Sequence, residues 1–114
     1  DMNDMVLIAN ALAQKITRQI TLIHMPVPRE RTDETYFKPL NMLKLKPDTD
    51  LYLGLIHYTD GLNGTKARID VARRFVPRFG IATECGFGRR DPKTIPALLK
   101  LHLAAHDYLI NIGE

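Results

Sequence analysis

The segment from Gly80 to Arg90, GIATECGFGRR, places several chemically active side chains next to one another. The chain's single cysteine, Cys85, directly follows the carboxylate of Glu84. Two arginines, Arg89 and Arg90, come after the glycines. A thiolate can attack an electrophile or bind a soft metal ion, and arginine binds carboxylates and phosphates. The pattern predicts an apolar strand that ends in a turn, the place where α/β proteins keep their chemistry. The alternative is a buried free cysteine before a solvated turn, with both arginines in solvent.

Two further predicted strands end near a histidine. His24 lies in IHMP, and His57 lies in IHYTDG, where Thr59 and Asp60 follow it closely. If the strands are parallel, both histidines meet Glu84 and Cys85 at one edge of the sheet. Histidine, carboxylate and thiolate together are ligands for Zn²⁺. No compact metal-binding spacing is present, so such a site would be assembled in space, and His24 can equally be a hydrogen-bonded core histidine.

The elements that must position these groups follow from periodicity and from turn residues. The pattern predicts helices over 4–17 and 65–76 and from about 94 onward, and buried strands over 20–25, 51–58 and 80–85. Residues 29–47 are expected to form a long loop with a turn of helix, and Thr65 is expected to be an N-cap. The first helix has apolar residues at intervals of three or four: Met5, Ile8, Ala9, Leu12 and Ile16. The last has them at Leu98, Leu101, His102, Ala105 and Leu109.

Alternating apolar strands and amphipathic helices predict an α/β fold with a parallel sheet and right-handed crossovers. Three strands make a thin sheet with two open edges. We therefore expect residues 1–114 to form one α/β unit that another segment or chain completes. The chain opens directly into a helix and without methionine, which indicates the C-terminal portion of something larger. Leu53, Leu55 and Ala82 are expected to face the missing part.

The composition excludes some classes of function. The chain has 114 residues, 45% hydrophobic and 25% charged, which is typical of a soluble globular chain. Its sixteen basic residues are interspersed with thirteen acidic ones, and the run Arg68, Arg73, Arg74 and Arg78 has spacings that suit the wet side of a helix. We therefore expect no nucleic-acid partner. Ile20–Val27 is too short to span a bilayer, so we expect no membrane association and a cytoplasmic location.

Two longer runs carry a family resemblance. LYLGLIHYTDG (51–61) and FGIATECGFGRRDPKTIPALLKLH (79–102) resemble the last two β/α units of the cobalamin-independent methionine synthase family, especially its shorter single-barrel relatives. Residues 3–37 also resemble those relatives, so the likeness covers nearly the whole chain. The resemblance implies the C-terminal portion of a (β/α)8 barrel of the TIM type, about its last three units.

The resemblance also implies a zinc-dependent methyl transfer to a thiol. Glu84, Cys85 and Gly86 fall on the family's Asp-Cys-Gly, whose cysteine is a zinc ligand, so Cys85 is the implied ligand here. His57 falls where the family has an aspartate, and Thr59 falls where it has a histidine assigned to proton transfer. The family's other zinc ligands, a His-x-Cys pair and a glutamate, have no counterpart in this chain.

Two hypotheses follow. In the first, the chain is part of a zinc enzyme that acts on a small thiol or amino acid and is completed by the rest of the barrel or by self-association. His57, Asp60 and Glu84 would be its catalytic residues, and the substrate would be bound by His24, Thr59, Arg89 and Arg90. In the second, the chain is a non-catalytic truncated barrel module for assembly or small-molecule binding.

Overall fold

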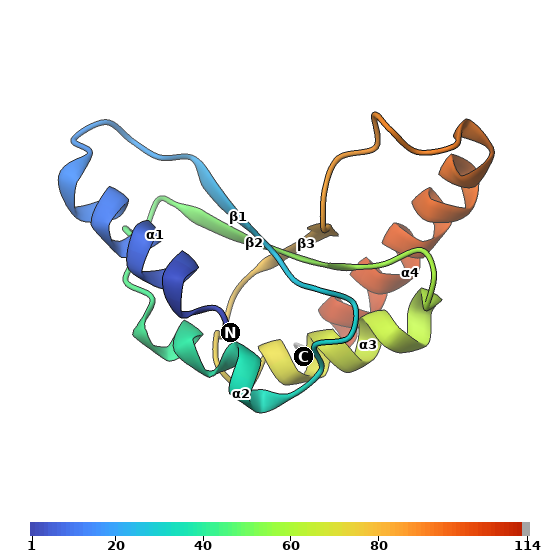
Figure 1. Cartoon of the computed structure of the whole chain (residues 1–114), viewed down its shortest axis with the longest axis horizontal. Helices are drawn as coiled ribbons and strands as arrows, with labels where there is room; N and C mark the ends of the chain where they lie inside the picture. The colour runs from blue at the N-terminus through green and yellow to red at the C-terminus, as the bar shows by residue number, and fades with distance from the viewer. Residues whose placement is uncertain (113–114) are drawn as a thin grey trace.

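Three short apolar segments form the sheet. In the computed structural model, which describes residues 1–112, the strands are β1 (Leu22–Pro26), β2 (Asp50–Ile56) and β3 (Gly80–Thr83). Their order is β1-β2-β3, and both neighbouring pairs are parallel. The predicted α/β fold, with three parallel strands alternating with helices in an open sheet, is confirmed (Figure 1).

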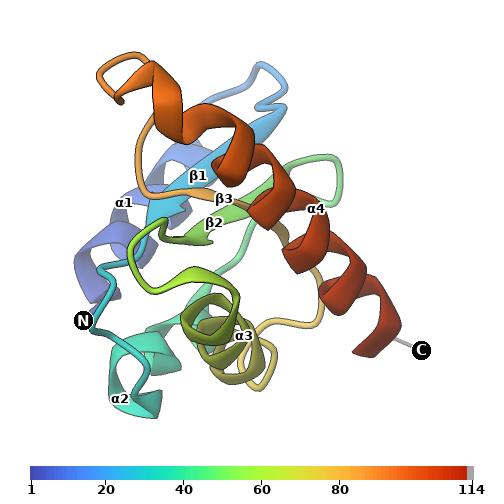
Figure 2. The same cartoon turned by 90° about the vertical axis from the view of Figure 1, so that its right-hand side faces the viewer.

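The helices lie below and beside the sheet and leave one of its faces uncovered (Figure 1). They are α1 (Asn3–Lys15), α2 (Glu34–Phe37) with the 3-10 helix η1 (Lys38–Met42), α3 (Gly61–Ala72), and α4 (Ile95–Ile112) after the 3-10 helix η2 (Pro92–Thr94). Helices α2 and α3 lie below the sheet in Figure 1, and α1 and α4 flank it on the two sides. Figure 2 shows the same arrangement, with α3 beneath the strands. Within residues 1–112, no helix covers the face that is turned up in Figure 1.

Aspartate side chains cap α2 and η2 at their amino ends. The Asp33 carboxylate accepts a hydrogen bond of 3.0 Å from the Tyr36 amide and caps α2. The Asp91 carboxylate accepts one from the Lys93 amide at the start of η2. Because α2 and η1 both lie within residues 29–47, the predicted turn of helix in that long connection is confirmed.

The start of α3 differs from the prediction. Thr65 is not its N-cap, because the helix already begins at Gly61. Gly61 has φ +60, a left-handed conformation that glycine adopts without strain, so the chain turns into the helix directly after Asp60. The Thr65 hydroxyl lies inside the helix and donates to the carbonyl of Gly61 at 2.8 Å.

The two faces of the sheet differ in exposure. Leu53 and Leu55 are fully buried on the face that packs against the helices, so the expectation that they face a missing part was wrong. Alternation along the strands puts Ala82 on the other face, as expected. That open face also carries His24 and Tyr52, which lie opposite each other on β1 and β2 and are both exposed.

The two flanking helices use their apolar residues differently. The predicted face of α4 is confirmed, since Leu98 and Ala105 are buried and Leu101, His102 and Leu109 are half-buried. The predicted face of α1 was wrong in part. This helix buries Val6, Ala9 and Ala13, and it leaves exposed three residues of the longer apolar stripe: Ile8, Leu12 and Ile16. No helix among the described residues is both long and apolar enough to cross a membrane.

Candidate functional site

A hollow of about 540 Å³ lies at the carboxyl edge of the sheet. His57 and Thr59 come to it from the segment after β2, and Glu84 comes from the end of β3. Arg29 and Tyr36 line it from the connection between β1 and β2. The structure thus brings together three of the predicted site residues, as the parallel strands require.

His57 makes the closest polar contacts in the hollow. Its Nε2 lies 2.7 Å from the carbonyl oxygen of Val27 and 3.8 Å from Oε2 of Glu84. A carbonyl can only accept a hydrogen bond, so Nε2 is the nitrogen that carries the proton. In the neutral ring, Nδ1 is therefore the nitrogen left to accept a proton. The His57 side chain is 13% exposed, which keeps it within reach of a small molecule.

Charged and hydroxyl groups give the hollow two different sides. Arg29 donates a hydrogen bond of 2.9 Å to the hydroxyl of Thr59 on one side, and Glu84 lies beside His57 on the other. Burial raises the pKa of the Tyr36 phenol, so its hydroxyl stays protonated and can donate. The hollow can therefore bind a small polar molecule and offers one group able to accept a proton.

Asp60 lies just outside the hollow and is bound by an arginine that the sequence interpretation placed in solvent. Arg68 is fully buried, and it donates from Nη1 and Nη2 to both Asp60 carboxylate oxygens at 2.7 and 2.9 Å. This hydrogen-bonded guanidinium lowers the pKa of Asp60. Asp60 is thus held ionised, which suits a fixed charge better than a proton donor.

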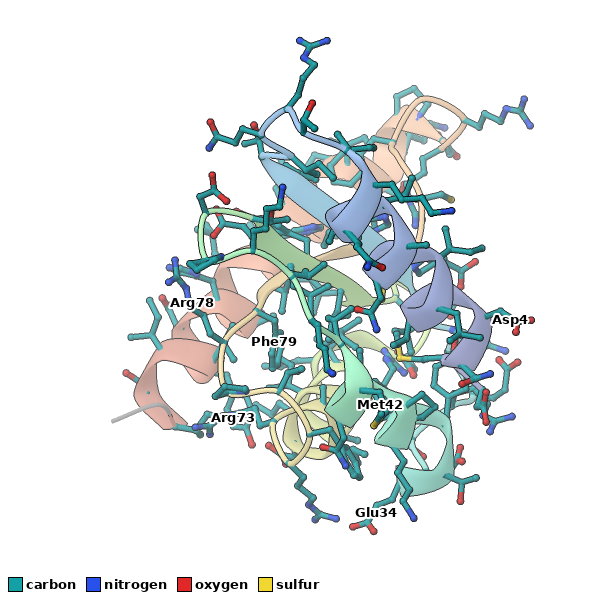
Figure 3. The ribbon with its side chains drawn as sticks, turned by 90° about the vertical axis from the view of Figure 1, so that its left-hand side faces the viewer. Asp4, Glu34, Met42, Arg73, Arg78 and Phe79 are labelled. Atoms are coloured by element: carbon teal, nitrogen blue, oxygen red, sulfur yellow. The ribbon has the colours of Figure 1, made fainter. Side chains whose placement is uncertain are left out.

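The prediction that the arginines from Arg68 to Arg78 lie on the solvent-facing side of a helix is correct only in part. Arg74 and Arg78 are exposed, and Figure 3 shows Arg78 at the edge of the molecule. Arg68 shares a face of α3 with Thr65 and Ala72, both buried. That spacing of three and four is the signal that could have identified Arg68 as a buried residue.

The remaining predicted residues do not line the hollow. Cys85 is exposed after β3, and its carbonyl accepts a hydrogen bond from the Thr83 hydroxyl. Arg89 is exposed, whereas Arg90 is half-buried, and its Nε makes no hydrogen bond within the described part of the chain. His24 Nε2 lies 3.0 Å from the Thr83 carbonyl, so this histidine joins β1 to the end of β3.

Among residues 1–112, no three His, Cys, Asp or Glu side chains gather closely enough to hold a metal ion. A structural or catalytic zinc site needs at least three protein ligands. The exposed thiol of Cys85 can supply one of them, and the others would have to come from outside the described residues.

A second hollow, of about 520 Å³, lies at the opposite edge of the sheet. Its walls include Leu43, Leu51 and Phe79, and Lys46 and Arg78 lie at its rim. The amino ends of β2 and β3 border it, and it contains none of the predicted site residues. In parallel α/β folds the chemistry lies at the carboxyl edge, so we assign the candidate site to the first hollow.

Comparisons with models of known protein families, with curated proteins and with solved structures found no match to this chain.

Proposed function

We propose that this chain is the C-terminal part of a (β/α)8 barrel and that it carries part of the active site of a zinc-dependent methyltransferase acting on a small thiol. The observation that carries the proposal is the pairing of His57 with Glu84 in a hollow at the carboxyl edge of a sheet whose helices lie on one side.

The strand order supports the barrel. In a doubly wound fold the strand order reverses and helices cover both faces, whereas in a barrel each strand pairs with the next and all helices lie outside. Here the order is β1-β2-β3, and the helices leave one face of the sheet uncovered (Figure 1). The uncovered face would be the interior of the barrel.

Exposed apolar residues on the flanking helices also support it. On α1, Leu7 and Ile8 are 58% and 60% exposed. On α4, Leu99 and Leu103 are 50% and 66% exposed. In a complete barrel each helix packs against two neighbours, and α1 and α4 are the helices whose outer neighbours would lie outside this unit.

The hollow supplies a proton acceptor for thiol chemistry. Methyl transfer to a thiol forms a carbon–sulfur bond, breaks the bond between the methyl carbon and the donor molecule, which keeps the electron pair as the leaving group, and releases the sulfur-bound proton. His57 Nδ1 would accept that proton, and the carboxylate of Glu84, 3.8 Å from Nε2, would stabilise the resulting imidazolium. Arg29 and Thr59, which line the hollow, would hold a polar group of the substrate.

Cys85 would be one of the zinc ligands, and bound zinc would lower the pKa of the substrate thiol. The test is the zinc content of the native protein at its natural length. We expect stoichiometric zinc that is lost in Cys85→Ser and retained in Thr94→Ser, a matched small change at a distance from the site. A folded native protein without zinc, whose Cys85 reacts with a thiol reagent equally fast with and without chelator, would contradict the proposal.

The second candidate is a non-catalytic barrel module for assembly or small-molecule binding. It is favoured by the use of His24, His57 and Asp60 in hydrogen bonds that join strands and loops. Residues used in this way can be purely structural. The second candidate predicts that the protein folds without zinc and that His57→Ala lowers stability without changing the binding of any small thiol.

A further inference from the structure

Arg68 joins the two chain segments that border the hollow. Its side chain is fully buried, and its guanidinium makes four hydrogen bonds. Nε donates to the carbonyl of Leu55 at 2.7 Å, and Nη1 donates to the carbonyl of Arg29 at 2.8 Å. The other two bonds go to Asp60. One side chain of α3 therefore binds β2, the segment after β1 and the segment after β2.

Each of these acceptors lies close in sequence to a residue that lines the hollow. Leu55 lies two residues before His57, and Asp60 directly follows Thr59. Arg29 itself lines the hollow, and its side chain reaches Thr59 while its backbone is held by Arg68. A shift of Arg68 would therefore move both sides of the hollow relative to each other.

We propose that Arg68 is the positioning residue of the candidate site, with Asp60 as its charge partner. Buried charges are retained when they are paired and fully hydrogen-bonded, and Arg68 meets that condition through Asp60 and two backbone carbonyls. The planar guanidinium is required, because only arginine can donate to three separate groups in fixed directions. The proposal concerns the hollow of the proposed function, but it does not depend on methyl transfer.

Two backbone amides report on the two segments. The Arg31 amide donates to the Pro28 carbonyl at 3.1 Å, and the Gly61 amide donates to the His57 carbonyl at 3.2 Å. The amide of Asp50, which donates to the Thr21 carbonyl at 2.9 Å, lies at the opposite edge of the sheet and is the reporter away from the site. Local loosening speeds exchange at the first two amides alone, whereas a global loss of stability speeds all three.

The test is amide hydrogen exchange of the full chain, read by NMR, in Arg68→Lys and in the control Arg73→Lys. Arg73 is the C-cap of α3 and donates to the carbonyl of Ile112, and it does not line the hollow. We expect Arg68→Lys to speed exchange at Arg31 and Gly61 by about ten-fold relative to Asp50, because it loses at least two charged hydrogen bonds. We also expect the His57 ring resonances to shift while those of His102 stay in place. The control should show neither effect.

Equal acceleration of all three amides, or an unmoved His57 ring, would overturn the proposal and leave Arg68 a stabilising residue only. If Arg68→Lys does not fold, Asp60→Asn carries the test, because it leaves the bonds from Arg68 to Leu55 and Arg29 in place. In that variant faster exchange at Gly61 supports the proposal, and unchanged exchange overturns it. Neither readout needs a substrate, so a failure of the proposed methyl transfer would be seen separately, in the zinc content.

Discussion

Gly64 leaves the space that the Asp60 carboxylate occupies. A Cβ atom at this position would lie 2.1 Å from Oδ2 of Asp60, far closer than atoms can approach. The carboxylate cannot simply rotate away, because Arg68 holds both of its oxygens. The ion pair between Asp60 and the buried Arg68 therefore requires that position 64 carries no side chain.

Gly64→Ala should therefore break that pair. We expect the free energy of unfolding to fall by about 2–4 kcal/mol, since leaving the fully buried Arg68 without its counter-charge costs about 3–5 kcal/mol and alanine in a helix regains about 1 kcal/mol. Urea unfolding measures the change. The matched control is Gly88→Ala, where an added Cβ meets no atom within 4 Å and φ is not positive. Equal stabilities of the two variants would contradict the expected clash.

The Asp60 carboxylate should also make stability depend on pH in the acid range. Arg68 lowers the pKa of Asp60 in the folded state below its ordinary value of 3.8. The pair therefore adds stability above 3.8, and this contribution is lost as the pH falls through the lowered folded-state pKa. We expect the native chain to exceed Asp60→Asn in unfolding free energy at neutral pH, and the difference to shrink below 3.8. A difference that stays constant throughout acid titration would refute this role of the pair.

The residue types of the site were predictable from the sequence, but their contacts were not. His57, Thr59 and Glu84 come together because parallel strands end at one edge, and that rule needs only the strand order. The burial of Arg68 is harder to predict, because a charged residue on a helix face is usually solvated. Its partner Asp60 lies eight residues earlier in the sequence, directly before α3 begins. The positions of Cys85, Arg89 and Arg90 depend on a loop, whose path the periodicity of neighbouring elements does not fix.

At the level of elements, the sequence predicted the helices and strands well and the helix faces less well. The face of α4 was predicted correctly, since Leu98 and Ala105 are buried, although Leu99 and Leu103 form a second apolar row that is exposed. In α1 two stripes compete: the small residues Ala9 and Ala13 face the core, and the larger Ile8 and Leu12 face outward. The size of the side chains alone favours the outward stripe, so the buried stripe becomes evident only from the contacts of α1 with η1. The outward stripe is what a missing neighbour would cover.

Helix α4 allows its two faces to be tested separately. Leu98 is fully buried, and Leu98→Ala should lower the free energy of unfolding by about 2–5 kcal/mol. Leu103 is 66% exposed, so Leu103→Ala should change it by no more than about 0.5 kcal/mol in the isolated chain. Urea unfolding of both variants measures these effects. A large loss in Leu103→Ala would mean that this face of α4 is already covered within the chain.

The whole molecule exposes more surface than a typical folded monomer of its mass. Its accessible surface is 7290 Å² for 13.0 kDa, whereas folded monomers of that mass expose about 6,300 Å². The radius of gyration is 14.3 Å, compared with about 13.3 Å for a compact chain of this length. The excess of about 1,000 Å² is close to the 800 Å² that one partner buries in a standard protein interface. Exposed apolar side chains on α1 and α4, the helices that flank the sheet in Figure 1, contribute to this surface: Leu7, Ile8, Leu99 and Leu103 (Figures 1 and 2).

The isolated chain should therefore not persist as a compact monomer. At about 25 cal/mol per Å², leaving a few hundred Å² of apolar surface exposed costs several kcal/mol, comparable to the whole stability of a small domain. Pairing with the rest of a barrel, or with further copies of the chain, would bury that surface and pair the free edges of β1 and β3. Light scattering on dilute, freshly purified chain should give a mass above 13.0 kDa, and thermal melting should be weakly cooperative. The barrel proposal predicts that a longer chain with the other barrel units forms one cooperative species, because both edges and both flanking helices then gain partners. A cooperatively melting monomer of 13.0 kDa would instead identify a self-contained α/β domain and remove the partial-barrel proposal.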